Sequence, residues 1–175
     1  MAHPLEALIP PTRPSLSEVD WTAIEQRLRL RLPADYKRLV EAYGLGSFDG
    51  FIWVLQPSET NQHLDLLRQR KVRLDALRAL QADGEVSPFG IDEDYEALAP
   101  WAITDNGDVC YWVMNELNKP EQWTVAVNEA RGPRWEMFDG SASEFLVGVL
   151  SRSLSVGLFP EDFPSEQPTF EAFAR

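Results

Sequence analysis

The most constraining feature of the chain is a helix start, a helix stop and a strand in immediate succession between residues 32 and 55. Leu32-Pro33 predicts a helix start, because a proline in the first turn has no N–H to leave unpaired and already has a helical φ. Gly44 supplies the left-handed conformation that ends many helices. The apolar run 51–55, stopped by Pro57, predicts a strand buried on both faces. Between start and stop, apolar residues recur at the spacing of one helix face: Tyr36, Leu39, Val40 and Tyr43.

Three further helices are expected. The first carries Trp21, Ile24 and Leu28 and begins between Ser15 and Asp20, each of which is a candidate N-cap. The next runs from about residue 61 to 82, and the last begins at residue 141, where a capping box precedes an apolar stripe. Basic side chains crowd the middle helix and either pair with the acidic half of the chain, form a solvated face or bind an anionic partner: Arg68, Arg70, Lys71, Arg73 and Arg78.

The second half of the chain predicts antiparallel strands. Asn106-Gly107 lies between the aromatic-rich runs 101–104 and 109–112 and predicts a hairpin with a two-residue type I′ turn. Two more strands are expected over 123–128 and 135–138. The predicted fold class is therefore α+β, with a mostly antiparallel twisted sheet of about four to six strands packed against N-terminal, middle and C-terminal helices.

The order of these segments resembles the SUKH superfamily, which includes bacterial immunity proteins and the yeast cell-wall assembly regulator family. The resemblance covers about residues 17–153 and departs from a minimal member at residues 58–98 and after Ser153. It rests on these segments, in the family's order: Trp21 to Leu28, Arg29-Leu30-Arg31-Leu32-Pro33, Tyr43 to Phe48, Phe51 to Leu55, Trp101 to Thr104, Asn106-Gly107-Asp108, Val109 to Trp112, Trp123 to Asn128, Trp135 to Phe138 and Glu144-Phe145-Leu146.

The expected organisation is one domain with two additions. Residues 1–14 are proline-rich and predict an extended arm, residues 15–153 a single SUKH-like domain, and residues 154–175 a tail rich in Phe, Pro and acids. The four phenylalanines of the tail either latch it onto the body or bind a partner.

Charge is distributed unevenly along the chain. The formal net charge is −12; residues 1–80 carry 11 Lys and Arg against 10 Asp and Glu, whereas residues 81–175 carry 5 against 18. This distribution argues against direct nucleic-acid binding, which needs a basic footprint, and favours a basic partner. The sequence shows neither a leader pattern nor an apolar stretch of the roughly 20 residues that a membrane helix needs. We expect a cytoplasmic protein without membrane contact, with a monomer favoured.

The residues predict no catalytic, metal or cofactor site. His3 and His63 have no spaced Cys or His companion, and Cys110 lies in an apolar strand where a buried small hydrophobe is expected. The stretch from Asp105 to Glu116 has the outline of a calcium loop but lacks oxygen ligands at inner positions, so a hairpin is favoured there. We therefore expect a protein that is not an enzyme.

The resemblance implies a non-enzymatic immunity protein that binds and neutralises a cognate polymorphic toxin of the nuclease or nucleic-acid deaminase class. The alternative that it implies is a regulatory protein–protein interaction module of the cell-wall assembly regulator type. For the first function we expect an acidic surface that faces a basic toxin, since opposite charge raises the association rate. The candidate partner-binding residues are Asp83, Glu85, Asp92, Glu93, Asp94, Glu96, Asp105 and Asp108.

Overall fold

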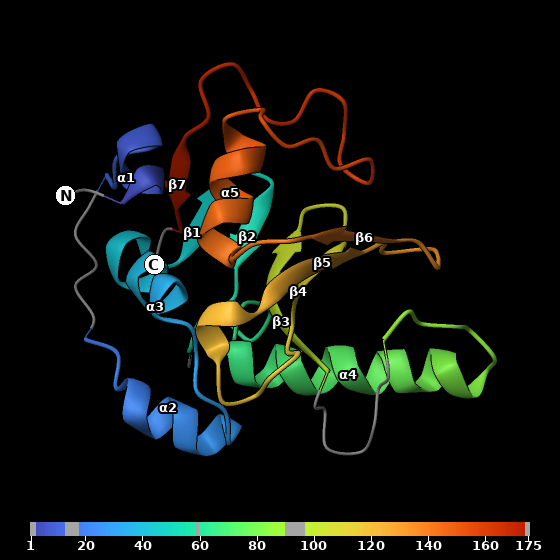
Figure 1. Cartoon of the computed structure of the whole chain (residues 1–175). Coiled ribbons are helices and arrows are strands. Elements are labelled where there is room, and N and C mark those ends of the chain that lie inside the picture. Colours follow the sequence, from blue (N-terminus) through green and yellow to red (C-terminus); the bar gives the residue numbers. More distant parts are fainter. Residues whose placement is uncertain (1–2, 13–17, 59, 90–96, 174–175) are drawn as a thin grey trace.

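A computed structural model describes residues 3–12, 18–58, 60–89 and 97–173. Within them, seven strands form one antiparallel sheet in the order β6-β5-β4-β3-β2-β1-β7, with helices on both faces (Figure 1). The α+β class is confirmed, with a strand count slightly above the expected range. The strands are β1 (Gly46–Phe48), β2 (Ile52–Val54), β3 (Leu98–Thr104), β4 (Val109–Val113), β5 (Thr124–Asn128), β6 (Trp135–Phe138) and β7 (Phe170–Ala172).

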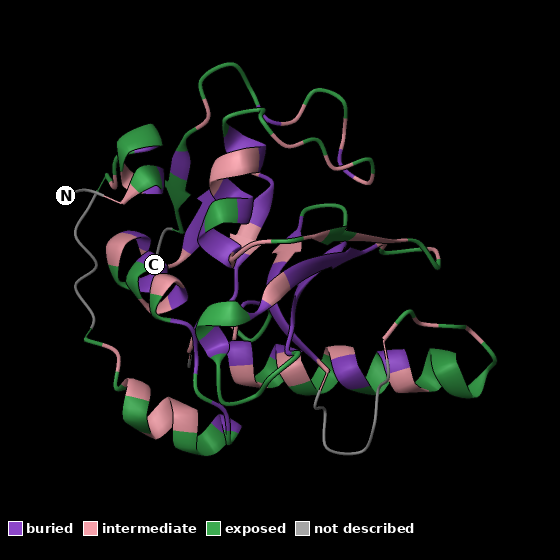
Figure 2. Ribbon diagram, in the orientation of Figure 1, coloured by how far each residue is buried: buried purple, intermediate pink, exposed green. Residues whose placement is uncertain are grey.

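The helices enclose two cores, one on each face of the sheet. The helical elements are α1 (Pro4–Leu8), α2 (Trp21–Leu28), α3 (Ala34–Tyr43), α4 (Leu66–Ala82), α5 (Ala142–Leu150) and the short 3-10 helix η1 (Pro120–Gln122). Alternate residues of β4 point to opposite faces: Trp112 belongs to the larger core with α1, α3 and α5, whereas Tyr111 and Val113 belong to the smaller core with Leu74 and Leu77 of α4. Figure 2 shows the buried residues concentrated in the sheet and on the sides of α3 and α5 that face it.

The expected boundaries of α2, α3 and α5 agree with the caps that the structure shows. Asp20 is the N-cap of α2, and its Oδ1 accepts the Ala23 N–H at 3.0 Å. The four apolar residues that predicted one face of α3 are all buried, and Gly44 ends that helix at φ 69°. The capping box between Ser141 and Glu144 opens α5.

The middle helix begins later than expected. The prediction placed its start near residue 61, but α4 begins at Leu66 because Asp65 is its N-cap and accepts the Arg68 N–H at 2.9 Å. Asn61 caps a separate turn, where its Oδ1 accepts the His63 N–H at 3.0 Å.

The β3–β4 hairpin closes with a three-residue loop, so the predicted two-residue turn is wrong. Thr104 and Asp108 pair through a backbone bond from Thr104 N–H to Asp108 O of 2.9 Å, and only Gly107 in the loop has a positive φ, of 92°. A type I turn followed by a left-handed glycine fits this pattern and explains why Asn106 keeps a negative φ.

Two strands that the sequence analysis did not predict extend the sheet at one edge. β1 pairs with β2 through a turn in which Asp49 and Gly50 both have positive φ, of 54° and 65°. β7 then pairs with β1, and its backbone approaches so closely that a Cβ on Gly46 would lie 2.2 Å from the Glu171 carbonyl oxygen. Glycine at position 46 is therefore required for β7 to dock.

The predicted extended arm is wrong for the residues that the structure describes. Residues 4–8 form α1, and Leu5 and Ile9 are buried in the larger core. Tyr43 Oη on α3 donates to the Ile9 carbonyl at 2.6 Å, and Arg38 Nε donates to Glu6 Oε1 at 2.8 Å. Apolar residues between the prolines thus attach the arm to α3.

The C-terminal tail packs on the body. The Phe170 ring lies 5.0 Å from the rings of both Tyr43 and Phe48, measured between centroids. Phe159 and Phe163 pack around Phe51, with centroid distances of 5.3 and 4.5 Å. Of the two alternatives for the tail, packing on the body is the one that Phe159, Phe163 and Phe170 follow. The Phe173 side chain is exposed.

Candidate partner-binding surface

The described members of the predicted acidic set lie in two separate places (Figure 1). Asp83 and Glu85 follow the end of α4, where the helix projects past the sheet. Asp105 is exposed at the tip of the β3–β4 hairpin, and its backbone N–H donates to the Phe51 carbonyl at 2.9 Å. The remaining four loop acids lie outside the described residues: Asp92, Glu93, Asp94 and Glu96.

Asp108 is a structural residue, which corrects its place in the predicted surface. Its side chain is only 4% exposed. Oδ2 accepts the Thr104 hydroxyl at 3.0 Å and Oδ1 accepts the Ala130 N–H at 2.9 Å. Both oxygens therefore hold the hairpin to the end of β5, and neither is available to a partner.

Four of the five basic residues of α4 contact groups in the part of the chain that the structure describes. Lys71 lies 2.9 Å and Arg78 3.8 Å from the carboxylate of Asp75 on the same helix. Arg70 donates to the Leu28 carbonyl at 2.7 Å, and Arg73 to the side chain of Gln69 at 3.1 Å. These contacts favour a structural role for the charges of α4 over a site for an anionic partner.

Burial disfavours ionisation of Cys110 and Tyr36 in the larger core. Burial raises the pKa of the Cys110 thiol, with Asp108 adding to the shift, so Cys110 is the buried small hydrophobe that was expected. Burial also raises the pKa of Tyr36, whose hydroxyl donates to the Leu55 carbonyl. Among the described residues, no group of three or more His, Cys, Asp or Glu is placed to hold a metal ion. Nor does any helix in that part of the chain combine the length and apolarity needed to cross a membrane.

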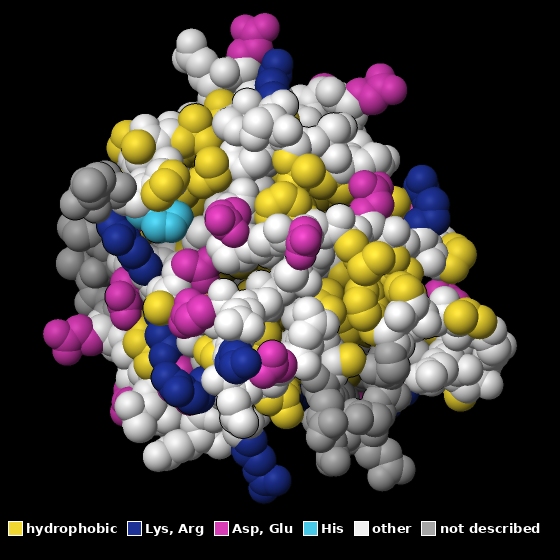
Figure 3. All heavy atoms as spheres, in the orientation of Figure 1, with side chains coloured by type: hydrophobic (Ala, Val, Ile, Leu, Met, Phe, Trp, Pro, Cys, Tyr) yellow, Lys and Arg dark blue, Asp and Glu magenta, His cyan; other side chains and the backbone are white. Residues whose placement is uncertain are grey.

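A hollow of about 720 Å³ opens on the face where α1, α3 and α5 meet. Figure 3 shows Asp and Glu side chains gathered on this face beside a histidine. Three carboxylates line the hollow, from Asp35 at the start of α3, Glu121 in η1 and Glu144 at the start of α5. Among the described residues, no lysine or arginine lines it. We call these three residues the acidic triad.

The acidic triad is positioned by helix ends. Glu121 Oε1 accepts the Ala34 N–H at 3.0 Å, which caps α3 because the residue at its N-cap position, Pro33, offers no side-chain acceptor. Asp35 accepts its neighbour's N–H through Oδ1, and through Oδ2 it accepts the Ser143 N–H of α5 at 3.1 Å. Glu144 Oε2 accepts the Ser141 N–H at 2.8 Å. The carboxylates thus satisfy the first N–H groups of both helices and draw the two helix ends together.

The sequence analysis did not select the acidic triad as a site. Glu144 was named only as part of a capping box and of a segment that carries the family resemblance, and Asp35 and Glu121 were not singled out. A local signal existed at position 33, since a helix that starts at a proline without a capping side chain needs an acceptor from elsewhere. Glu121 supplies this acceptor but is far away in the sequence, so only the fold identifies it.

Comparison with known proteins places most of the chain in a known family. The family model described as SUKH_6, SMI1-KNR4 cell-wall, matches residues 18–146, which is the greater part of the chain. No curated protein and no solved structure gave a significant match. The matched segment begins at the entry to α2 and ends within α5, so α1 and the tail lie outside it.

Proposed function

We propose, from the premise that this chain belongs to the SMI1-KNR4 (SUKH) family, that it is a non-enzymatic immunity protein that binds and neutralises a cognate toxin. Membership of this family supports an immunity or regulatory role through protein–protein interaction. The observation that carries the proposal is the family match over residues 18–146. Membership leaves the chemistry of the toxin open, and the nuclease or nucleic-acid deaminase class is part of the proposal.

The proposed mechanism is electrostatic capture of a basic toxin. The net charge of −12 supports it, because a surface of one sign raises the rate at which an oppositely charged protein associates. The exposed residues Asp83 and Asp105, the half-buried Glu85 and the acidic loop 92–96 remain the proposed contact residues, without Asp108.

The test measures association with the toxin encoded beside this protein's reading frame. We expect the association rate to fall as salt rises, because screening shortens the reach of the attraction. Reversal of the loop charges in Asp92→Lys/Glu93→Lys/Asp94→Lys should slow association about tenfold or more at low salt. Stopped-flow fluorescence of the purified pair provides the rate.

A matched control separates the effect of the loop charges on the association rate from the effect of the total charge. The variant Glu161→Lys/Asp162→Lys/Glu166→Lys makes the same charge change at three exposed tail residues. It should slow association clearly less than the loop variant does. Equal slowing by both variants would overturn the placement of the contact, and a rate indifferent to salt and to both variants would overturn the electrostatic mechanism.

A regulatory interaction module is the second candidate, favoured by the cell-wall description of the matching family. Deleting both chain ends would not discriminate the two functions, because Leu5, Ile9, Phe159 and Phe170 are buried in the core. Surface variants are suitable instead. Leu8 and Phe173 are exposed near the two ends of the chain. If the protein binds regulatory partners through these ends, Leu8→Ser and Phe173→Ser should weaken that binding. Neutralisation of the toxin should be unchanged.

A further inference from the structure

We propose that the hollow between α3, α5 and η1 receives an arginine side chain of the partner. The proposal rests on the proposed function, because it takes the partner to be a protein with a basic surface. It assigns a binding role to the acidic triad, which lies apart from the acidic loop 92–96 in the sequence.

The acidic triad keeps acceptor capacity after capping the helices. Glu121 and Glu144 are exposed, and each uses one carboxylate oxygen for a backbone N–H. Among the described residues, the second oxygen of each has no partner. Each carboxylate can therefore accept charge-assisted hydrogen bonds from a guanidinium without losing its cap.

The same contacts disfavour an anion. Helix N-termini favour anions when their N–H groups are open. Here the Ala34 N–H of α3 and three N–H groups at the start of α5 already donate to the side chains of Glu121, Asp35, Ser141 and Glu144. The charge that remains at the hollow is negative, so its complement is a cation.

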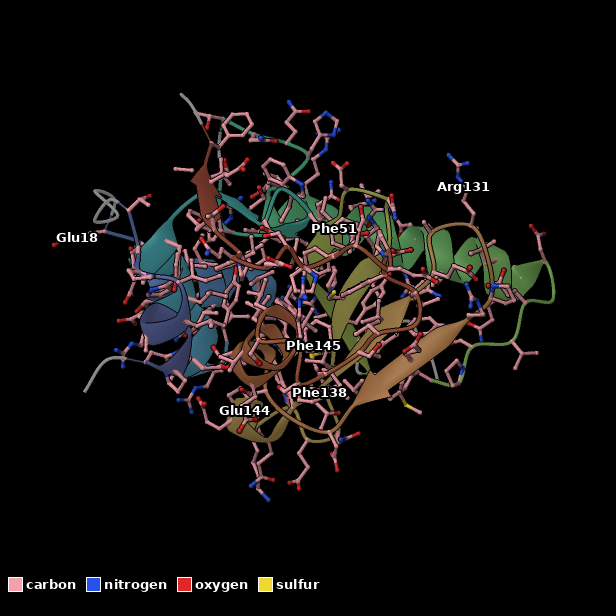
Figure 4. All side chains as sticks on the ribbon, turned by 90° about the horizontal axis from the view of Figure 1, so that it is seen from above. Glu18, Phe51, Arg131, Phe138, Glu144 and Phe145 are labelled. Atoms are coloured by element: carbon pink, nitrogen blue, oxygen red, sulfur yellow. The ribbon has the colours of Figure 1, made fainter. Side chains whose placement is uncertain are left out.

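The wall of the hollow fits the stem and the plane of an arginine. Phe138, Val147 and Leu154 line it and are half-buried. Figure 4 shows Glu144, in the first turn of α5, beside Phe138. An aromatic ring next to carboxylates suits a guanidinium, which stacks on rings and forms paired hydrogen bonds, better than the compact ammonium of lysine.

A buried hydroxyl gives independent support. Ser143 lines the hollow and is 2% exposed, yet its Oγ has no hydrogen-bond partner. Buried hydroxyls nearly always have a partner, and the backbone N–H of this residue is already used by Asp35. A further N–H donor in the hollow would satisfy Oγ.

The experiment titrates the isotope-labelled full chain with N-acetyl-arginine amide and follows backbone amide signals by NMR. We expect shifts confined to residues around the hollow, foremost Ala34, Ser143 and Glu144, and none with the neutral probe N-acetyl-norleucine amide. The variant Glu121→Gln/Glu144→Gln should bind the arginine probe about tenfold more weakly. Glutamine retains the carbonyl oxygen that accepts in each cap, so this variant should keep the fold.

The control variant Glu161→Gln/Glu166→Gln removes the same charge from the exposed tail and should leave the affinity for the probe within about twofold. Equal weakening in the control variant, or shifts spread over many acidic sites, would overturn the proposal. Measurement of toxin binding distinguishes failure of this proposal from failure of the proposed function. Neutralisation with full affinity by Glu121→Gln/Glu144→Gln overturns the arginine site alone, whereas no binding of the toxin by the wild type overturns the function.

Discussion

Asp108 shows at the residue scale how an acidic side chain can serve the fold. Asp108→Ala leaves the Thr104 hydroxyl and the Ala130 N–H without their acceptor. We expect a loss of about 2 kcal/mol in the free energy of unfolding, because the Thr104 hydroxyl is buried, whereas Ala130 is exposed and its N–H can bind water instead. Urea unfolding followed by tryptophan fluorescence measures it.

Asp105 is the matched control, because it lies in the same hairpin but is exposed, and within the described part of the chain only its backbone N–H is hydrogen-bonded. Asp105→Ala should change the free energy of unfolding by about 0.5 kcal/mol or less. Similar losses for the two variants would show that Asp108 does not hold the hairpin to β5.

The difference between these two aspartates marks what the sequence can predict for single residues. Cys110 was correctly assigned to the core, because its neighbours are apolar and strand periodicity is local. Asp108 was assigned to the surface because its neighbours form a polar turn, and its acceptor role depends on Ala130 at the end of another strand. The acidic triad was missed for the same reason, since its hydrogen bonds join distant helices.

At the element scale, Glu25 connects α2 to α3 and predicts a pH dependence. Burial opposes ionisation of its carboxyl, but the Leu32 N–H at 2.8 Å and Lys37 at 2.5 Å outweigh it and lower the pKa below the ordinary 4.5. A carboxyl with a lowered folded-state pKa stabilises the fold above its unfolded-state pKa, and this contribution is lost as pH falls through the folded-state value.

We therefore expect the wild type to exceed Glu25→Gln in free energy of unfolding by a constant margin above about pH 6. The margin should shrink below pH 4.5, as Glu25 becomes protonated in both states. Urea unfolding of both proteins from pH 3 to pH 7, a range set about the ordinary carboxyl pKa, tests this. A margin independent of pH would mean that the charge of Glu25 contributes nothing.

Elements with local signals were predictable, and elements made by long-range pairing were not. The helices α3 and α5 followed from apolar spacing and caps. β1 has only three residues and lies next to glycines, and β7 lies in a tail of mixed Phe, Pro and acids. Their pairing joins residues 46–48 to residues 170–172, so no window of the sequence contains the signal.

At the scale of the whole molecule, segments outside the family match complete the core. α1 contributes Leu5 and Ile9, and the tail contributes Phe159 and Phe170. Both additions contact Tyr43 of α3, whose hydroxyl binds the Ile9 carbonyl and whose ring packs on Phe170. The two ends of the chain therefore meet at one helix, although residues 1–14 were expected to form an extended arm and packing of the tail was one of two alternatives.

This arrangement predicts that the tail belongs to the same cooperative unit as the sheet. Phe170 is 6% exposed and packs on Tyr43 and Phe48, whereas Phe173 is 48% exposed. Phe170→Ala should lower the free energy of unfolding by about 3 kcal/mol or more, because it leaves a cavity between α3 and β1. Phe173→Ala keeps its backbone bond to the Leu45 carbonyl and should cost about 0.5 kcal/mol or less. Urea unfolding gives both values, and hydrogen exchange should show faster exchange of the β1 amides in Phe170→Ala. Equal stability of the two variants, with unchanged exchange in β1, would mean that the tail is an attachment on a domain that is complete without it.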